Sequence, residues 1–206
     1  MNTTSRRIRK ASGLPAGAGG ARDFVAVDDI GDFSYHRSEE DLIAAFEYVG
    51  EAACVIDRSG GSYRLVLDAN RHLVLGQVLG PVEFRWLRHA WLGAQNAHPD
   101  EHRLRRFYPV TSDEVVSDLF ETLALERGRE PAESAWSVDI EGFASRPSSL
   151  KEIDRMLARQ KPLEHVRVKD PFGHIYRPAR HRSHWYLPAS AGAILYVEVP
   201  APVTTH

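Results

Sequence analysis

The sequence predicts an α+β fold in which a mostly antiparallel sheet packs with about four amphipathic helices. Strand-type runs are short and joined by turns of hairpin length, and helix-capping sequences precede runs of helical periodicity. Strands and helices are interspersed without a regular βαβ pattern, which disfavours a doubly wound parallel sheet. Hydrophobic residues make up 43% of the 206-residue chain and charged residues 26%, as in globular proteins that bury a core.

The strongest β signal lies between residues 52 and 79. Three apolar runs at 52–57, 63–68 and 72–79 are separated by turns that contain glycine, serine and asparagine, so they predict an antiparallel meander. Further strands are predicted at 24–27, 33–36, 104–108, 134–143, 165–169, 174–177, 184–187 and 193–199. No internal repeat is evident among these segments.

Four helices are predicted from capping residues and apolar periodicity. Ser38 and the acids after it start a helix at 39–49, which Gly50 stops. Pro81 starts a second helix that extends to residue 95, because proline suits the first helical position. Capping boxes that begin at Thr111 and Ser149 start the third and fourth helices.

The chain divides into a tail and a folded part. Residues 1–22 are expected to form a disordered basic tail, because they hold Arg6, Arg7, Arg9 and Lys10 and few apolar residues. Their lack of acids before residue 23 also fits an organelle presequence. Residues 23–206 are expected to be a single α+β domain, and no apolar run approaches the roughly 18 residues of a membrane span.

Charge and cysteine content narrow the classes of function. The formal net charge is −2, from 26 basic and 28 acidic residues, which gives no overall attraction to nucleic acid. The single cysteine, Cys54, excludes an internal disulfide and lies in an apolar run, so we expect it to pack in the core. This cysteine usage fits a reducing cytosol, and the protein is therefore expected to be cytoplasmic.

No motif for catalysis or cofactor binding stands out, so neither a cofactor nor a metal is predicted. The chain has no phosphate-binding glycine loop and no nucleophile elbow. His98 and His102 have the i, i+4 spacing of a zinc-binding helix. However, Pro99 and Asp100 lie between them and indicate a polar loop instead.

One enzymatic alternative rests on the triplet His-Arg-Ser, which occurs at 36–38 and again at 181–183. Paired His-x-Ser/Thr elements resemble those of the 2H phosphoesterases, in which two histidines act as acid and base on a cyclic phosphate. His36 and His181 would then be catalytic in a 2H-like phosphoesterase or RNA-processing enzyme. This alternative requires both histidines to face one cleft, whereas Ser38 is better explained as a helix cap.

Nucleic acid is a second alternative partner. Arginines cluster at 103–106 and at 177–182, with Tyr176, Trp185 and Tyr186 nearby for base stacking. Arginine-rich surface strands are more common than binding platforms, so nucleic acid is not the predicted partner.

Part of the chain resembles a known family. The segments YHRSEEDLIAAFEYVGEAACVIDRSGGSYRLVLDANRHLVLG, GPVEFRWL and HRLRRFYP resemble, in pattern and order, the immunity proteins of bacterial polymorphic toxin systems, of the immunity protein 61 type from actinobacteria. The resemblance covers roughly residues 33–125. It implies a non-enzymatic cytoplasmic protein that binds and blocks a cognate toxin, and it carries over no functional residue.

A local excess of acids gives this hypothesis a candidate binding surface. Asp28, Asp29, Asp32, Glu39 and Glu40 lie close together in sequence and could steer a basic toxin towards the chain. The alternative is a solvated loop followed by a helix cap. Reversal of Asp28, Asp29 and Asp32 to lysine is expected to slow association with a basic partner and to change folding little.

Overall fold

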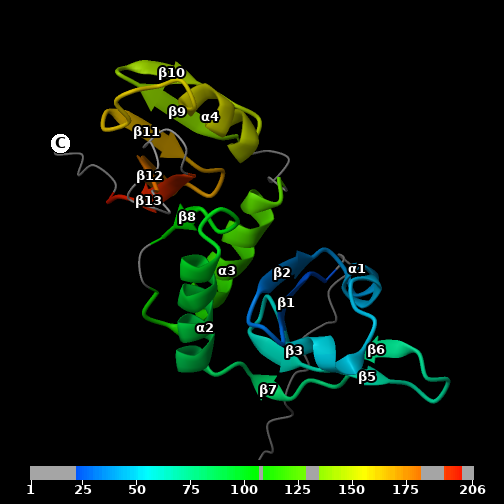
Figure 1. Cartoon of the computed structure of the whole chain (residues 1–206). Helices are drawn as coiled ribbons and strands as arrows, with labels where there is room; N and C mark the ends of the chain where they lie inside the picture. Colours follow the sequence, from blue (N-terminus) through cyan, green and yellow to red (C-terminus); the bar gives the residue numbers. More distant parts are fainter. Residues whose placement is uncertain (1–21, 107–108, 129–134, 182–192, 201–206) are drawn as a thin grey trace, which may run out of the picture.

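The computed structural model describes residues 22–106, 109–128, 135–181 and 193–200 (Figure 1). Within these ranges the chain forms four α-helices and 13 strands in mostly antiparallel sheets, which confirms the predicted α+β class. The helices are α1 (Glu39–Ala44), α2 (Phe84–Ala97), α3 (Ser112–Glu126) and α4 (Leu150–Leu157), with a 3-10 turn η1 (Val49–Glu51). The strands are β1 (Phe24–Asp28), β2 (Phe33–His36), β3 (Ala52–Asp57), β4 (Gly61–Tyr63), β5 (Leu65–Leu67), β6 (Leu73–Leu75), β7 (Gly80–Pro81), β8 (Leu104–Arg105), β9 (Ser137–Ile140), β10 (Phe143–Ser145), β11 (Val166–Lys169), β12 (Ile175–Arg180) and β13 (Ile194–Glu198).

Two main sheets form opposite ends of the molecule in Figure 1, with α2 and α3 between them. The first sheet has the strand order β2-β1-β3-β4-β7, and the second has the order β10-β9-β11-β12-β13-β8. A separate hairpin pairs β5 with β6. All of these neighbours are antiparallel except β13 and β8, which run parallel.

The two sheets share one connectivity, so the chain contains an internal structural repeat, contrary to the expectation from the sequence that there is none. In each unit a hairpin is followed by a helix, a second hairpin and a last strand: β1-β2-α1-β3-β4-β7 in the first unit (residues 24–81) and β9-β10-α4-β11-β12-β13 in the second unit (residues 137–198). The five strands take the same spatial order in both sheets. The β5–β6 hairpin is an insertion in the first unit.

The second hairpin of each unit turns on the same side-chain arrangement. Asp57 accepts hydrogen bonds from the amides of Ser59 (2.8 Å) and Gly61 (2.9 Å), and from the Tyr63 hydroxyl (2.8 Å). Asp170 likewise accepts from the amides two and four residues later (both 2.9 Å) and from the Tyr176 hydroxyl (2.8 Å). The shared sequence is Asp-x-x-Gly-x-x-Tyr, in which the glycine has a positive φ of 78° or 103°. Three identities in seven residues fix the turn but are too few to reveal a repeat.

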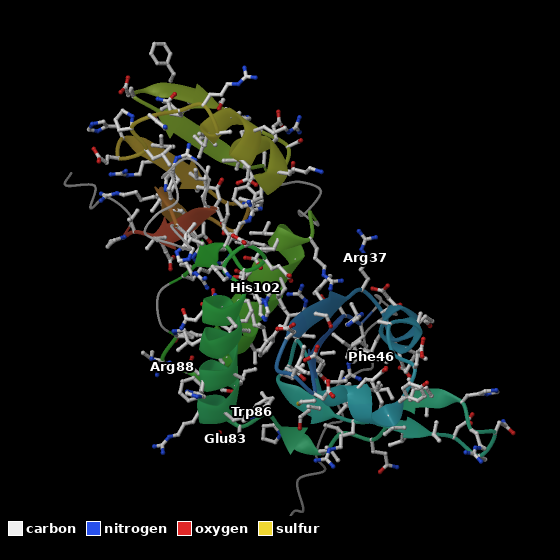
Figure 2. All side chains as sticks on the ribbon, viewed as in Figure 1. Arg37, Phe46, Glu83, Trp86, Arg88 and His102 are labelled. Atoms are coloured by element: carbon white, nitrogen blue, oxygen red, sulfur yellow. The ribbon has the colours of Figure 1, made fainter. Side chains whose placement is uncertain are left out.

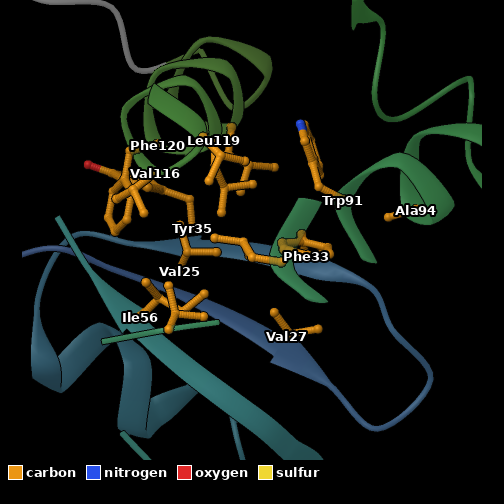
Figure 3. Close-up of a cluster of buried hydrophobic side chains, with 14 of the residues drawn as sticks. Val25, Val27, Phe33, Tyr35, Ile56, Trp91, Ala94, Val116, Leu119 and Phe120 are labelled. Atoms are coloured by element: carbon orange, nitrogen blue, oxygen red, sulfur yellow. The ribbon is translucent and has the colours of Figure 1, made fainter. Parts of the chain in front are cut away.

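A helix pair covers one face of the first sheet. Val25, Val27 and Ile56 point from the sheet into a core that α2 and α3 complete. Figure 3 shows Val116, Leu119 and Phe120 of α3 facing these strands. The other face packs against α1 and the β5–β6 hairpin through a second cluster that includes Leu42 and Leu65. The first sheet is therefore covered on both faces.

The second sheet has its own core, to which the last turn of α3 also contributes. Trp136, Val138 and Val168 pack with α4, and Leu125 of α3 joins them. Because α3 packs against the first sheet along most of its length and against the second at its end, the two units share this helix. The single domain expected over residues 23–206 stays a prediction.

The first predicted helix is shorter than expected. It ends at Ala44 instead of residue 49, and the 3-10 turn follows. The Glu51 carboxylate accepts hydrogen bonds from the amides of Glu47 (2.6 Å) and Tyr48 (3.2 Å), which would otherwise bond within a continuing helix. A competing cap therefore ended the helix before Gly50.

The predicted meander and the helix start at Pro81 were also wrong in detail. The run at 63–68 breaks at Arg64, whose carbonyl accepts from the Gly76 amide (2.8 Å) so closely that a Cβ at Gly76 would lie 2.9 Å from that oxygen. Pro81 returns to pair with Gly61 as β7. The helix starts at Phe84, because the Glu83 carboxylate caps its first amides.

Some of the remaining sequence predictions are confirmed, and others concern residues that the structure does not describe. Thr111 and Ser149 cap α3 and α4 as predicted, whereas the strand predicted at 134–143 is the β9–β10 hairpin. Of the tail predicted at 1–22, residues 1–21 lie outside the described residues, as does the strand predicted at 184–187. Arg22 is described, and its side chain pairs with Asp57, so the folded part begins one residue earlier than predicted. The longest described helix, α3, has 15 residues, and no helix in the described ranges has the length and hydropathy of a membrane span.

Candidate functional site

The predicted acidic residues lie around the β1–β2 turn and the start of α1, but they have different roles. The Asp28 carboxylate accepts hydrogen bonds from the amides of Ile30 (3.0 Å) and Asp32 (2.8 Å), so it holds the turn together. Asp32 pairs with His98 at the end of α2 (3.0 Å) and ties the turn to that helix. Both carboxylates are already engaged within the chain. The expectation that their reversal would change folding little is therefore revised.

The remaining three predicted acids lie at the surface of the protein. Asp29, Glu39 and Glu40 are exposed, and Glu39 and Glu40 belong to the first turn of α1, where negative charge complements the helix dipole. Ser38 caps this helix by accepting from the Asp41 amide (3.2 Å), as predicted. A hydrogen bond from Ser38 lowers the pKa of Glu40, which therefore stays charged at neutral pH.

Exposed apolar side chains lie next to these acids. Ile30, at the tip of the turn, is 78% exposed, and Tyr48 in the next loop is 66% exposed. The amide of Asp29 donates to the carbonyl of Glu51 (3.1 Å), which places η1 with Val49 beside the turn. The surface thus combines an apolar tip with an acidic rim.

An open pocket of about 400 Å3 lies behind this rim, between the edge strand β2 and α1. Three carboxylates line it, from Asp28, Asp32 and Asp41, together with His36, Phe46 and Arg127. Figure 2 shows Phe46 among the side chains beside α1 and Arg37 projecting away from the fold. Arg127 donates to the carbonyl of Tyr35 in β2 (3.0 Å), so α3 closes one side of the pocket. The predicted residues Asp28 and Asp32 do meet in one place.

The two histidines of the enzymatic alternative lie in different sheets. His36 is in β2, is 3% exposed and shares a hydrogen bond with the Ser34 hydroxyl (2.8 Å). Burial, reinforced by the positive charge of Arg127, lowers its pKa. His181 follows β12 in the second sheet, where its amide bonds to the Ala193 carbonyl (2.8 Å). The pocket that His36 lines does not include His181.

The arginine segment considered for RNA binding is used inside the protein. Arg103 pairs with Asp154 of α4 (2.5 Å), and Arg105 donates to the backbone carbonyl of Gln95. Arg106 is 2% exposed and bonds to carboxylates of α3 and of the Asp170 turn. The segment fastens the second unit to the helix pair, which accounts for its charge.

A second cluster of titratable groups surrounds Arg106 and was not predicted. Its guanidinium contacts Asp118 (3.0 Å), Glu121 (2.5 Å) and Asp170 (2.8 Å), and it also donates to the Tyr176 hydroxyl (2.8 Å). His174 adds contacts to Glu198 (2.6 Å) and Glu121 (3.6 Å). A second open pocket of about 400 Å3 is lined by Pro109, Val110 and five members of this cluster: Arg106, Asp118, Glu121, His174 and Glu198. Asp118 and Glu121 share one side of α3, but no sequence signal connects them with His174.

The pKa values in this cluster are strongly shifted. The interaction of the imidazole N–H with the Glu121 carboxylate is the main reason why the pKa of His174 rises to about 9, so this imidazole is charged at neutral pH. Burial raises the pKa of Asp118 to about 6 despite the neighbouring Arg106. Burial alone would raise the pKa of Glu121, but bonds from His174 and Arg106 hold it at about 2. Such shifts are common in functional sites and in structural ion networks alike.

The described residues offer no metal centre. No group of three or more histidine, cysteine or acidic side chains among them has the arrangement to hold a metal ion. His98 and His102, the pair with zinc-like spacing, face different partners: His98 pairs with Asp32, and His102 shares a hydrogen bond with Glu126 (3.1 Å). Cys54 is half-buried against the first core, and burial raises the pKa of its thiol.

Comparison with known proteins gives no relative. No protein-family model matches the chain, and neither a curated protein nor a solved structure is significantly similar to it.

Proposed function

We propose that this chain is a cytoplasmic, non-enzymatic immunity protein that binds and blocks a cognate toxin of a bacterial polymorphic toxin system. The observation that carries the proposal is the surface at the β1–β2 turn, where the exposed Ile30 is bordered by the acids Asp28, Asp29 and Asp32. The resemblance of residues 33–125 to such immunity proteins supports it.

This surface has the two components that a protein interface uses. Apolar side chains near the centre of an interface supply most of the binding energy once they are buried, and charged residues at the rim steer the approach of the partner. Ile30, Tyr48 and Val49 are the candidates for the central contact. Asp29, Glu39 and Glu40 are the candidates for the rim, and their charge selects a basic toxin surface.

The pocket behind the rim gives the partner a place to insert a cationic side chain. A lysine or arginine that enters between β2 and α1 would meet three carboxylates, from Asp28, Asp32 and Asp41, against one guanidinium, from Arg127. A toxin that acts on an anionic substrate such as nucleic acid needs basic residues in its cleft. A surface of this kind would therefore block the cleft by charge as well as by shape.

The first test is biological. A toxin encoded beside this chain should arrest growth when expressed alone, and co-expression of the chain should restore growth. A purified complex of the two proteins should be stable in gel filtration. Failure of co-expression to rescue growth from the neighbouring toxin would contradict the proposal.

The second test separates steering from anchoring by association kinetics at two ionic strengths. Asp29→Lys/Glu39→Lys should lower the association rate about tenfold at low salt and much less at high salt, because exposed charges are screened. Ile30→Ser should leave the association rate nearly unchanged and raise the dissociation rate. The matched control, Glu141→Lys/Glu164→Lys, makes the same charge change at exposed positions around the second sheet. Equal slowing by both double variants would place the interface elsewhere.

No observation on the described residues favours the enzymatic alternative. It requires both histidines in one cleft, whereas His36 lies in β2 of the first sheet and His181 follows β12 of the second. Assay of the purified chain on a cyclic phosphodiester, with His36→Ala as the comparison, checks this alternative directly.

A further inference from the structure

The face of the second sheet that points away from α4 is open in the described part of the chain. A groove of about 540 Å3 runs over it between β9, β11 and β12. Basic side chains border the groove, and its floor is partly apolar; the lining includes Ser137, Asp139, Arg167, Lys169, Ile175 and Arg177. The neighbouring Val197 on β13 is 43% exposed.

The corresponding face of the first unit is covered by helices. Alignment of the two units at their shared turn matches the cross-strand pair Val25–Ile56 to the pair Ser137–Lys169. The pair Val27–Cys54 likewise matches Asp139–Arg167. In the first unit these positions are apolar and α2 and α3 pack on them. The first unit therefore shows that a helix can pack on this face of the repeated fold when the residues on the face are complementary to that helix.

The residues that differ between the two units on this face determine which side chains a helix would need in order to pack on the second unit. Lys169 replaces the buried Ile56, and Arg167 replaces Cys54. Within the described ranges, Arg167 donates only to the backbone carbonyls of Glu164 and Val166 (both 3.1 Å), and neither Lys169 nor Arg177 has an ion pair there. A helix on this face must bring carboxylates to these cations and apolar side chains to Ile175 and Val197.

We propose that this face binds an acidic amphipathic helix of a partner protein, seated as α3 is seated on the first sheet. This site is separate from the acidic edge of the first unit. The basic groove selects an acidic partner, whereas the acidic edge selects a basic one. Among the described residues no aromatic ring lines the groove to stack on a base, so the described lining favours a helix over single-stranded nucleic acid. The groove binds the helix through a cationic border and an aliphatic floor.

The experiment uses the full chain and a labelled synthetic peptide of about 18 residues, long enough to form a helix when bound, with leucine at i, i+3, i+4 and i+7 and glutamate elsewhere. Fluorescence anisotropy should show saturable binding. Lys169→Glu/Arg177→Glu should weaken the affinity about tenfold or more. Ile175→Ser should weaken it as well, because the floor contact is lost. The control, Lys151→Glu/Arg159→Glu, makes the same charge change at exposed positions on and just after α4 and should bind as the unmodified chain does.

Several outcomes would overturn the proposal. A scrambled peptide of identical composition that binds equally well would show that charge alone is recognised and no helix is. A single-stranded oligonucleotide that binds more tightly than the peptide, and loses affinity in Lys169→Glu/Arg177→Glu, would make the face a nucleic-acid site. Failure of an amine-acetylating reagent to modify Lys169 in the free chain would show that the face is already covered. None of these results bears on toxin binding at the acidic edge.

Discussion

In the first unit, Asp57 bonds to Arg22, whose side chain is 54% exposed, whereas in the second unit Asp170 bonds to Arg106, which is 2% exposed. The bonds from the two backbone amides and the tyrosine hydroxyl are the same in both units. The comparison therefore distinguishes the interactions that form the turn from those that the second unit adds to it. The aspartate and tyrosine form the turn, and the buried arginine with its extra carboxylates is an addition specific to the second unit.

The extra charged groups of the second unit result from the residues that surround its turn. In the second unit α3 brings Asp118 and Glu121 to the turn, and His174 stands where the first unit has Gly61. In the first unit a Cβ at Gly61 would lie 3.0 Å from the Asp57 carboxylate, which leaves little room for a side chain there. One scaffold therefore carries a simple ion pair at one end of the molecule and a titratable cluster at the other.

The largest expected difference concerns the two arginines. Arg106→Met leaves three carboxylates without their shared cation, one of them fully buried, and should cost about 3–5 kcal/mol of unfolding free energy. Arg22→Met removes a largely exposed partner and should cost under about 1 kcal/mol. Urea unfolding of both variants measures the difference. Equal losses would mean that the cluster around Arg106 contributes no more than the single Arg22–Asp57 pair.

Substitution of Tyr63 and Tyr176 tests the turn interactions that the two units share. Tyr63→Phe and Tyr176→Phe each remove one hydroxyl bond to the turn aspartate (2.8 Å in both units) and should each cost about 1–2 kcal/mol. The same unfolding measurement applies, with both variants expected to agree within about 0.5 kcal/mol. A cost confined to Tyr176 would show that the two turns are alike only in geometry.

A pH series distinguishes the cluster from the simple pair. The pKa of His174 is raised from 6.5 to about 9 in the folded protein, so its contribution is fully present below pH 6.5 and is lost as pH rises towards 9. Its neighbours in this window are Glu121, Glu198, Arg106, Asp118 and Asp170. His174→Gln should remove a decline on the order of 1 kcal/mol, after allowance for partial exposure.

Asp118 titrates in a separate window. Its folded pKa of about 6 lies above the ordinary value of 3.8, so its protonated form stabilises the fold at low pH, and that contribution is lost as pH rises through 6. The difference between the thermal melts of wild type and His174→Gln from pH 6.5 to 9 therefore reports mainly on the histidine, with Asp118 contributing at the lower end of this range. Identical pH profiles of the two proteins in that range would refute its role.

The smallest predicted effect compares neighbouring acids in the β1–β2 turn. Asp28→Lys should cost about 1 kcal/mol, because two backbone amides lose their acceptor. Asp29→Lys should cost under about 0.5 kcal/mol, because its side chain is exposed. Melting temperatures of the two variants check the order. A cost for Asp29 that matched that of Asp28 would show that both acids hold the turn, and the rim would lose one of its steering charges.

Local rules account for the parts of the fold that the sequence predicted. Caps at Ser38, Thr111 and Ser149 involve atoms within four residues, so the pattern and the structure contain the same information. The end of α1 was wrong because Glu51, beyond the expected stop, competes for the amides of Glu47 and Tyr48. Nothing in the periodicity of 39–49 reports that competition.

The candidate sites were predicted less well, since they depend on contacts between distant segments. Adjacency in sequence grouped Asp28 with Asp29, although one carboxylate points into the turn and the other into solvent. The pattern Asp28-x-x-Gly31 could have indicated this, because it is typical of turns in which aspartate accepts from later amides. Arg106 was interpreted as a surface charge, because its partners on α3 and at Asp170 lie 12 to 64 residues away.

The position of β13 in the second sheet affects the order in which the chain can fold during synthesis. All strands of the first sheet have been made by residue 81, whereas β13 (Ile194–Glu198) lies between β12 and β8 and joins them. A ribosome therefore releases the strands of the first unit more than a hundred residues before those of the second sheet can close. Until then β8 and β12 present unpaired edges, which makes a stalled or truncated chain prone to aggregate through its second half.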